Sequence, residues 1–211
     1  MLRLQGTRIL GALVRQLGPE KVLRRMAALL LDEHDTQFVS LVVQALNFIL
    51  LTSGDLRPLR AKLRQSGAGA ADGQSLFEVR HAMPHLRPHQ GAVGIGLSEL
   101  ERASLLSLSW IPSRVRHPLT QALLPCWTCS FGAAMSLCLL CERYALAASM
   151  VQAFETREVP LPVFTQADRL VSMLETPVFT FLRLHLTEGR PDLLAALQRL
   201  LAVLPQSDAF R

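Results

Sequence analysis

The sequence predicts an all-α protein, a HEAT or armadillo-like α-solenoid built from helical hairpins. Along most of the 211 residues, apolar side chains recur three and four positions apart, which places them on one side of an α-helix. Short joints that contain glycine, proline or a capping residue separate these stretches. The chain has a single Tyr and few β-branched runs, which disfavours a sheet. Because short joints make consecutive helices antiparallel, each helix buries its apolar side against its neighbours.

Residues 1–65 are predicted to form the first helical hairpins of the solenoid. A helix over residues 7–17 ends at Gly18, and Pro19 with Glu20 begins the second, as helix N-termini favour. Asp35 is expected to cap a long third helix over residues 36–51, and Ser53 to begin a fourth. The residues expected to face inward are Ile9, Leu10, Leu13, Val14 and Leu17, then Val22, Leu23, Met26, Leu29 and Leu30, then Phe38, Val42, Ala45, Leu46 and Ile49, and finally Leu56, Leu59 and Leu63, beside the basic Arg57, Arg60, Lys62 and Arg64.

Residues 66–124 interrupt this pattern. Residues 66–73 read SGAGAADG, the composition of a flexible joint, and residues 80–124 are rich in proline and glycine. One helix is expected there, from Ser98, with Glu101 completing a capping box, to the residue before Pro112. Because residues 80–124 have no continuous apolar face, their deletion is expected to leave helix content and melting temperature nearly unchanged.

Residues 125–211 are predicted to form further helical repeats. Helices are expected over residues 132–144 and 145–154, followed by a connector over 159–162 and a helix ending at residues 175–177. Thr176 is expected to cap the next helix through its hydroxyl, and Gly189 to end it. The residues expected to face inward are Met135, Leu139, Leu140, Leu146 and Val151, then Leu170, Val171 and Leu174, then Phe181, Leu182 and Leu186, with Arg183 outward, and, after Pro191, Leu193, Leu194, Leu197, Leu200, Leu201 and Leu204.

The cysteines form two CxxC pairs, Cys126 with Cys129 and Cys138 with Cys141. Four thiolates at such spacing could bind zinc. The second pair, however, lies within an apolar helix, and no glycine- or asparagine-rich turn surrounds either pair. The sequence therefore favours buried free thiols over a zinc site.

No other group of residues predicts a catalytic, cofactor-binding or metal-binding site. His81, His85 and His89 are four apart, but the prolines between them exclude a regular helix, so a solvated loop is expected. Residues 91–96, GAVGIG, have the wrong glycine order for a phosphate-binding loop, and no lysine follows them. Serine, histidine and aspartate are present, but none lies in the sequence context of a catalytic nucleophile.

The net charge of +5 comes almost entirely from arginine, and these arginines are scattered without interleaved aromatic residues. Nucleic-acid binding is therefore disfavoured. The first residues have basic flanks but no small-residue cleavage site, which makes a poor signal peptide. The apolar stretches 38–51 and 131–141 are shorter than the roughly 20 residues of a membrane-spanning helix. We expect a cytoplasmic protein without direct membrane insertion.

Three runs of sequence resemble a known family. They are DTQFVSLVVQALNFILLTSGDLRPLRAKLRQ at residues 35–65, ETPVFTFLRLHL at 175–186 and LLAVLPQSDAF at 200–210. Their order and joints are similar to the C-terminal region of the vacuole-morphology scaffold family. The resemblance covers residues 7–79 and 125–210, so residues 80–124 are expected to be an insertion relative to the family.

The resemblance implies a non-enzymatic scaffold without cofactors. Its expected partners are a Sac-type phosphoinositide phosphatase and a PIKfyve-type lipid kinase, bound in one complex, together with further copies of itself through residues 125–211. Such a scaffold is expected to regulate phosphatidylinositol 3,5-bisphosphate while held on endosomal, lysosomal or vacuolar membranes by its partners. The alternative is a generic HEAT-like adaptor for protein interactions in transport or signalling.

The acidic residues Asp32, Glu33, Asp35, Asp168 and Glu175 are expected to serve as helix caps and solvated side chains. The alternative is that the turns at residues 32–35 and 184–191 lie along one edge of the solenoid and contact the phosphatase.

Overall fold

The computed structural model describes residues 2–65, 118–152 and 161–204, and within these ranges all of its regular structure is helical, with no strand. The all-α prediction is confirmed. In chain order the helices are α1 (Leu2–Leu17), α2 (Pro19–Leu31), α3 (Thr36–Thr52), η1 (Gly54–Leu56), α4 (Arg57–Gln65), α6 (Pro118–Trp127), α7 (Phe131–Leu140), α8 (Tyr144–Gln152), α9 (Leu161–Leu174), η4 (Pro177–Phe179), α10 (Phe181–Thr187) and α11 (Pro191–Val203).

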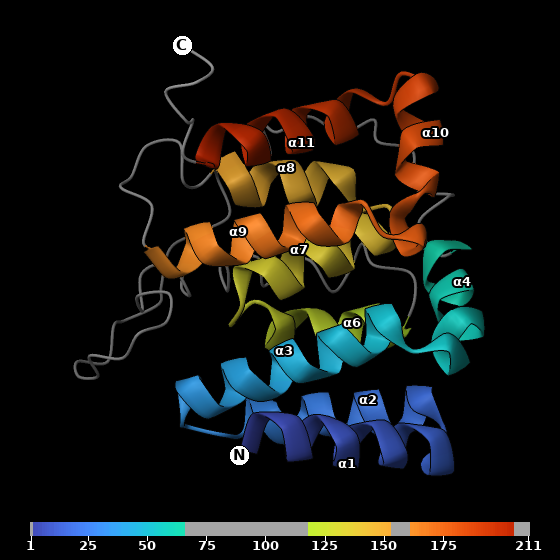
Figure 1. The fold of residues 1–211 in the computed structure, drawn as a ribbon, viewed down its shortest axis with the longest axis vertical. Coiled ribbons are helices and arrows are strands. Elements are labelled where there is room, and N and C mark those ends of the chain that lie inside the picture. Colours follow the sequence, from blue (N-terminus) through green and yellow to red (C-terminus); the bar gives the residue numbers. More distant parts are fainter. Residues whose placement is uncertain (1, 66–117, 153–160, 205–211) are drawn as a thin grey trace.

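The helices stack along one axis, from α1 and α2 at one end to α11 at the other (Figure 1). α1 packs against α2 and α3, and α2 packs against α6. Towards the other end, α7 packs against α8 and α9, and α8 packs against α11. Each helix thus buries its apolar side against the next layer, which is the arrangement of an α-solenoid.

Glycine and capping residues end and begin the helices largely as predicted. Gly18 separates α1 from α2 with φ of 87°, and Gly189 follows α10 with φ of 75°, both in the left-handed region that glycine adopts without strain. Asp35 caps α3, because its carboxylate accepts hydrogen bonds from the backbone N–H groups of Gln37 and Phe38. The prediction for Thr176 is wrong: its hydroxyl donates to the Met173 carbonyl at 2.7 Å, closing α9 instead of capping the next helix.

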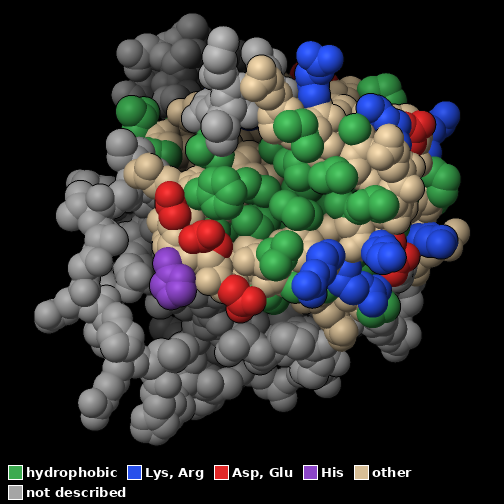
Figure 2. Space-filling view, turned by 90° about the horizontal axis from the view of Figure 1, so that it is seen from below, with side chains coloured by type: hydrophobic (Ala, Val, Ile, Leu, Met, Phe, Trp, Pro, Cys, Tyr) green, Lys and Arg blue, Asp and Glu red, His purple; other side chains and the backbone are tan. Residues whose placement is uncertain are grey.

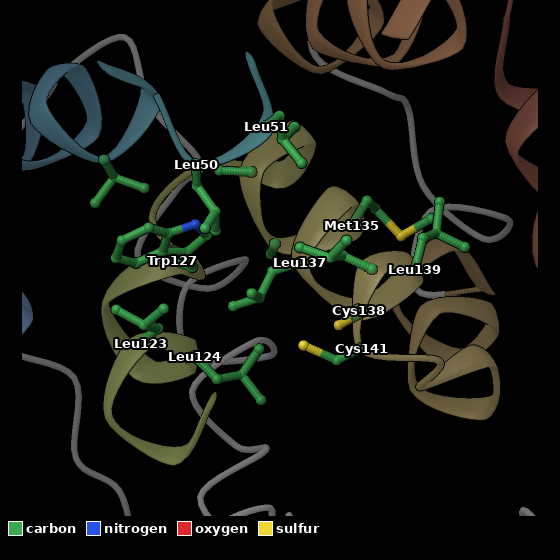
Figure 3. Close-up of a cluster of buried hydrophobic side chains, with 14 of the residues drawn as sticks. Leu50, Leu51, Leu123, Leu124, Trp127, Met135, Leu137, Cys138, Leu139 and Cys141 are labelled. Carbon is green, nitrogen blue, oxygen red and sulfur yellow. The ribbon is translucent and has the colours of Figure 1, made fainter. Parts of the chain in front are cut away.

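α7 forms the centre of the core. Among its residues only Gly132 is not buried, since α3, α4, α6, α8 and α9 surround it. A helix that is apolar on every side is stable only in such a position. Its first turn is held from α9, where Gln166 Oε1 accepts hydrogen bonds from Ser130 Oγ and the Gly132 N–H, each at 3.0 Å. Figure 3 shows the surrounding core, with Met135, Leu137, Cys138 and Leu139 of α7 near Leu50 and Leu51 of α3 and Leu123, Leu124 and Trp127 of α6.

The predicted inward faces are correct for some helices and rotated in others. Leu56, Leu59 and Leu63 are buried as predicted. In α3 the buried face instead contains Val39, Val43, Leu46, Ile49 and Leu50, whereas Phe38 is 40 % exposed. Because α3 is apolar on more than one side, periodicity alone does not identify the side that meets its neighbours.

The two ends of the stack show the same discrepancy. In α1 only Val14 is buried and Leu10 packs on the core, while Ile9 and Leu17 are mostly exposed. In α11 Leu193, Ala196 and Leu200 are buried, but Leu194 and Leu201 are about half exposed. An end helix has a neighbouring layer on one side only, so a second apolar stripe remains uncovered.

The prediction that residues 66–124 lie outside the core is wrong for residues 118–124. These residues form the first part of α6, which packs against α2, and Leu119, Leu123 and Leu124 are buried. Composition concealed this helix because its apolar residues follow directly on a proline- and glycine-rich stretch. The joint at 66–73, the histidines at 81, 85 and 89, the glycines of 91–96 and the helix expected from Ser98 lie outside the described residues.

Asn47 is a buried polar residue that joins three helices. Its Oδ1 accepts hydrogen bonds from Trp127 Nε1 of α6 at 3.3 Å and from Ser136 Oγ of α7 at 3.1 Å. Asn47 itself is 5 % exposed, and the indole and the hydroxyl are fully buried. The three groups satisfy one another where water has no access.

Replacing Asn47 by Leu is expected to cost about 2 kcal/mol, because the Trp127 N–H then loses its acceptor inside the core. The melting temperature should fall by about 5 °C, measured by calorimetry or circular dichroism. Gln37→Leu, on the exposed side of the same helix, is the matched control and should leave the melting temperature nearly unchanged. Equal melting temperatures for the two variants would contradict this account of the junction.

Candidate functional site

One edge of the stack gathers charged and aromatic side chains from segments far apart in the sequence. We call it the α4–α10 edge; it comprises α4, residues 142–144 at the joint between α7 and α8, and residues 177–190. In Figure 1 the short helices α4 and α10 lie one above the other along this side of the stack, steeply inclined to the long helices. The edge is positioned by three joints, each of which has a physical cause in the sequence.

The first joint is the sharp turn from α3 into α4, where the chain bends by 80°. Arg60 holds this turn, because its Nη1 donates to the Leu50 carbonyl at 2.9 Å and to the Ser53 carbonyl at 2.7 Å. These bonds satisfy carbonyl groups at the end of α3 that have no partner within the helix. Burial lowers the pKa of Arg60, and the neighbouring charges of Arg57 and Arg64 lower it further. The sequence placed Arg60 among surface cations, but it is a buried structural residue.

The second joint links α4 to α10. The guanidinium carbon of Arg64 lies over the Phe181 ring, 4.9 Å from its centroid, a cation–π contact. Phe181 in turn lies beside the buried Phe179 of η4, with ring centroids 6.3 Å apart. The runs 35–65 and 175–186, which carried the family resemblance, therefore meet in space at this contact.

The third joint connects α10 to the start of α8. The Phe181 ring meets the His185 ring edge to face at 5.5 Å, and His185 Nδ1 forms a hydrogen bond with the Tyr144 hydroxyl at 2.6 Å. The Tyr144 side chain is fully buried. An aromatic and hydrogen-bonded chain thus runs from α4 through α10 into the core.

Beside Tyr144 lies a charged pair with strained backbone. Glu142 has φ of 55°, unusual for a residue other than glycine, and its side chain is 8 % exposed. Arg190 Nη1 lies 3.8 Å from its carboxylate, and the Arg190 guanidinium lies 6.0 Å from the Tyr144 ring centroid. The pair joins the α7–α8 turn to the N-terminus of α11, so two successive turns of the solenoid are held in register.

The outer surface of the edge is basic and partly apolar. Arg57, Lys62 and Arg183 are exposed on it, and Leu184 of α10 is 61 % exposed. Cations around an exposed apolar side chain suit the recognition of an acidic protein surface. The groups beneath this surface serve to fix the positions of α4 and α10 and do not form a nucleophile with an adjacent base.

The cysteines do not gather into a metal site. Cys126, Cys138 and Cys141 are buried as predicted, whereas Cys129 is half-buried. Burial raises the pKa of Cys126 to about 12 and that of Cys141 to about 11, and it also raises that of Cys138. Thiolate, the metal-binding form, is therefore disfavoured. Among the described residues, no three His, Cys, Asp or Glu side chains lie close enough to hold a metal ion.

The acidic residues are exposed side chains, as expected, with Asp35 in its capping role. Glu33 Oε1 accepts from the backbone N–H groups of His34 and Asp35, which shapes the turn before α3. The idea that the turns at 32–35 and 184–191 share an edge is wrong. Figure 1 shows the turn between α2 and α3 on the side of the stack opposite α10.

Sequence reasoning missed the cluster of Glu142, Tyr144, His185 and Arg190. One signal was available, since residues 142–144 read ERY between two apolar helices, where a turn into solvent would not need an aromatic residue. The partners of these residues lie about 40 positions later, and helical periodicity carries no information on such contacts.

Comparison with known proteins adds the following findings. Residues 1–83 and 101–211 match the family model of the C-terminal region of vacuolar protein 14, the region that binds a Sac-type phosphatase. The chain is 32 % identical to the "Protein VAC14 homolog" of Arabidopsis thaliana over 99 % of its own length and 22 % of that protein. It is 30 % identical to the "Protein VAC14 homolog" of Schizosaccharomyces pombe, over 100 % of its own length and 20 % of that protein.

A third relative is the "Vacuole morphology and inheritance protein 14" of Saccharomyces cerevisiae, 29 % identical over 96 % of this chain and 18 % of that protein. The chain thus spans about a fifth of the length of the curated relatives it matches. No solved structure matches. The family match leaves residues 84–100 uncovered and includes residues 101–124, so the insertion expected at 80–124 is wrong at both of its ends.

Proposed function

This chain belongs to the family of the phosphatase-binding C-terminal region of vacuolar protein 14, and we propose that it is a non-enzymatic scaffold that binds a Sac-type phosphatase. The observation that carries the proposal is the family match over residues 1–83 and 101–211. The scaffold further binds a PIKfyve-type lipid kinase and other copies of itself. By holding kinase and phosphatase together, it regulates phosphatidylinositol 3,5-bisphosphate on vacuolar and endolysosomal membranes.

The α4–α10 edge is the surface proposed to contact the phosphatase. Two observations support this assignment. The runs at 35–65 and 175–186, which resemble the family, meet there through Arg64 and Phe181. The edge also presents the exposed cations Arg57, Lys62 and Arg183 on short helices whose positions are fixed by buried contacts. A rigid basic surface of this kind favours an acidic region of the partner.

Capture of the phosphatase by the purified, immobilised chain tests the proposal. Wild-type chain should retain a Sac-type phosphatase, whereas the triple variant Arg57→Glu, Lys62→Glu, Arg183→Glu should bind it at least about tenfold more weakly. Arg169→Glu, an exposed charge reversal on α9, is the control and should bind as wild type does.

The two parts of the proposal fail separately in this experiment. Absence of capture by the folded wild-type chain would refute phosphatase binding, and a generic HEAT-like adaptor with transport partners would then be favoured. Equal capture by wild type and the triple variant would refute the assignment to the α4–α10 edge while leaving the function in place.

Membrane residence is proposed to depend on partners. Over the described residues no single helix has the length and apolarity to cross a membrane; α3 with η1 and α4 passes that test only as a pair bent by 80°. Within this pair Val43, Leu46 and Leu50 are buried in the protein core. α4 is basic, but its apolar residues Leu59 and Leu63 are also buried and so do not face lipid.

The purified chain is therefore expected not to co-sediment with anionic liposomes at about 150 mM salt, because its cations are scattered and its basic helix has no free apolar face. The measurement is the bound fraction after centrifugation, with liposomes of neutral lipid as the control. Substantial binding to the anionic vesicles alone would show that the chain reaches membranes without a partner.

A further inference from the structure

The end of the solenoid formed by α1 and α2 carries an uncovered apolar surface. We call it the α1–α2 face and define it by Ile9, Leu13 and Leu17 of α1 and Leu29 of α2, which are 62 %, 36 %, 59 % and 51 % exposed. Figure 2 views this end and shows apolar side chains gathered across its middle. The opposite sides of α1 and α2 pack against α3 and α6. Contiguous exposed apolar surface of this kind marks an interaction site.

The face has opposite charges at its two ends. Near the start of α2 lie the exposed cations Lys21, Arg24 and Arg25, of which Arg24 is tied to Glu20 at 2.8 Å. At the other end of α2 lie the exposed Asp32, Glu33 and Asp35. In Figure 2 the basic and acidic side chains appear on different sides of the apolar middle. At 1.5 Å per residue, Arg25 and Asp32 are separated by about 10 Å along the helix.

This distribution is self-complementary. A two-fold axis through the middle of the face makes α2 antiparallel to α2 of the second copy. The apolar middle then meets itself, and the basic end of each copy lies over the acidic end of the other. A two-fold interface requires a patch of this type, because the same surface must serve as both partners. The alternating charges also exclude the parallel arrangement, in which like charges would meet.

From these observations we propose that the α1–α2 face binds the α1–α2 face of a second copy of this chain, in a two-fold symmetric dimer. The proposal deepens the self-association included in the proposed function and assigns a surface to it. It does not involve the α4–α10 edge, which lies along the side of the stack and not at its end (Figure 1). The complement of every feature of the face is present on the face itself, which favours a second copy over an unrelated helical partner.

Analytical ultracentrifugation of the purified 211-residue chain tests the proposal. Wild type should show a concentration-dependent monomer–dimer equilibrium. Replacing Leu29 by Asp should raise the dimer dissociation constant at least about tenfold, since it places like charges near the axis. Because Leu29 is half exposed, the melting temperature of the monomer should change little, which separates loss of the dimer from loss of the fold.

A charge-exchange pair provides the sharper test. Arg25→Glu alone and Asp32→Lys alone each place like charges together in the homodimer, so each should dimerise more weakly than wild type. A mixture of the two variants should form a heterodimer, since the introduced glutamate of one chain then meets the introduced lysine of the other, while the native Arg25 and Asp32 still meet. The double variant Arg25→Glu, Asp32→Lys should recover the homodimer.

Three results would overturn the proposal. Wild type could remain monomeric up to about 100 μM, a concentration at which even a weak dimer forms, as expected if another helical segment covers this face. The chain could dimerise equally with and without Leu29→Asp, which would locate the interface elsewhere. The mixture could fail to associate better than its components. Phosphatase capture by Leu29→Asp is expected to equal that of wild type, so failure of the dimer is distinguishable from failure of the proposed function.

Discussion

Replacing Leu182 by Arg is expected to lower the melting temperature by about 10 °C or to abolish cooperative unfolding. Leu182 is 4 % exposed, in the first turn of α10 and close to the buried Phe179. The substitution removes a buried leucine, at a cost of about 2 kcal/mol, and places a cation without a partner in its site, at a cost of several more. The sum is comparable with the whole stability of a domain, roughly 5–15 kcal/mol.

Arg183→Ala, one residue further along, is the matched control. Arg183 is exposed, so its removal should cost well under about 1 kcal/mol and change the melting temperature little. Thermal unfolding followed by circular dichroism distinguishes the two variants. Similar melting temperatures would mean that α10 faces the other way. Normal stability of Leu182→Arg with lost phosphatase capture would show that this side of α10 is an interface and not part of the core.

Deleting residues 80–124 is expected to destroy the cooperative fold, although composition alone predicted a neutral deletion. The deletion removes the first turns of α6, including Leu119, Leu123 and Leu124, which are 0 %, 0 % and 4 % exposed. Truncating one buried leucine costs about 2–5 kcal/mol, so the loss of three approaches the total stability. α2 would lose the helix against which it packs.

Deletion of residues 84–100 is the control for this experiment. These residues lie outside the family match and outside the described part of the chain. Their removal should preserve the melting temperature and the helical signal, measured by circular dichroism. If the longer deletion were as stable as the shorter one, α6 would not be part of the core. If the shorter deletion unfolded the chain, residues 84–100 would be needed for the fold.

The α3–α4 region shows how far local sequence reaches. The Asp35 cap, the length of α3 and the buried Leu56, Leu59 and Leu63 follow from nearby residues, because hydrogen bonds to the first turn and helical periodicity act within a few positions. The role of Arg60 does not follow. Its guanidinium is buried only because the chain bends by 80° and brings it to the carbonyl groups of Leu50 and Ser53.

The sequence by itself determined the helical class, most of the joints between helices and, through three resembling runs, the family. These properties depend on local hydrogen bonding, backbone conformation and short-range periodicity. Tertiary structure decided which side of each apolar helix is buried, that residues 118–124 belong to the core, and that Arg64, Phe181, His185 and Tyr144 form one chain of contacts. The physical reason is that these properties depend on which helices become neighbours, and in a stack of helices with several apolar sides that choice is made by packing between distant segments.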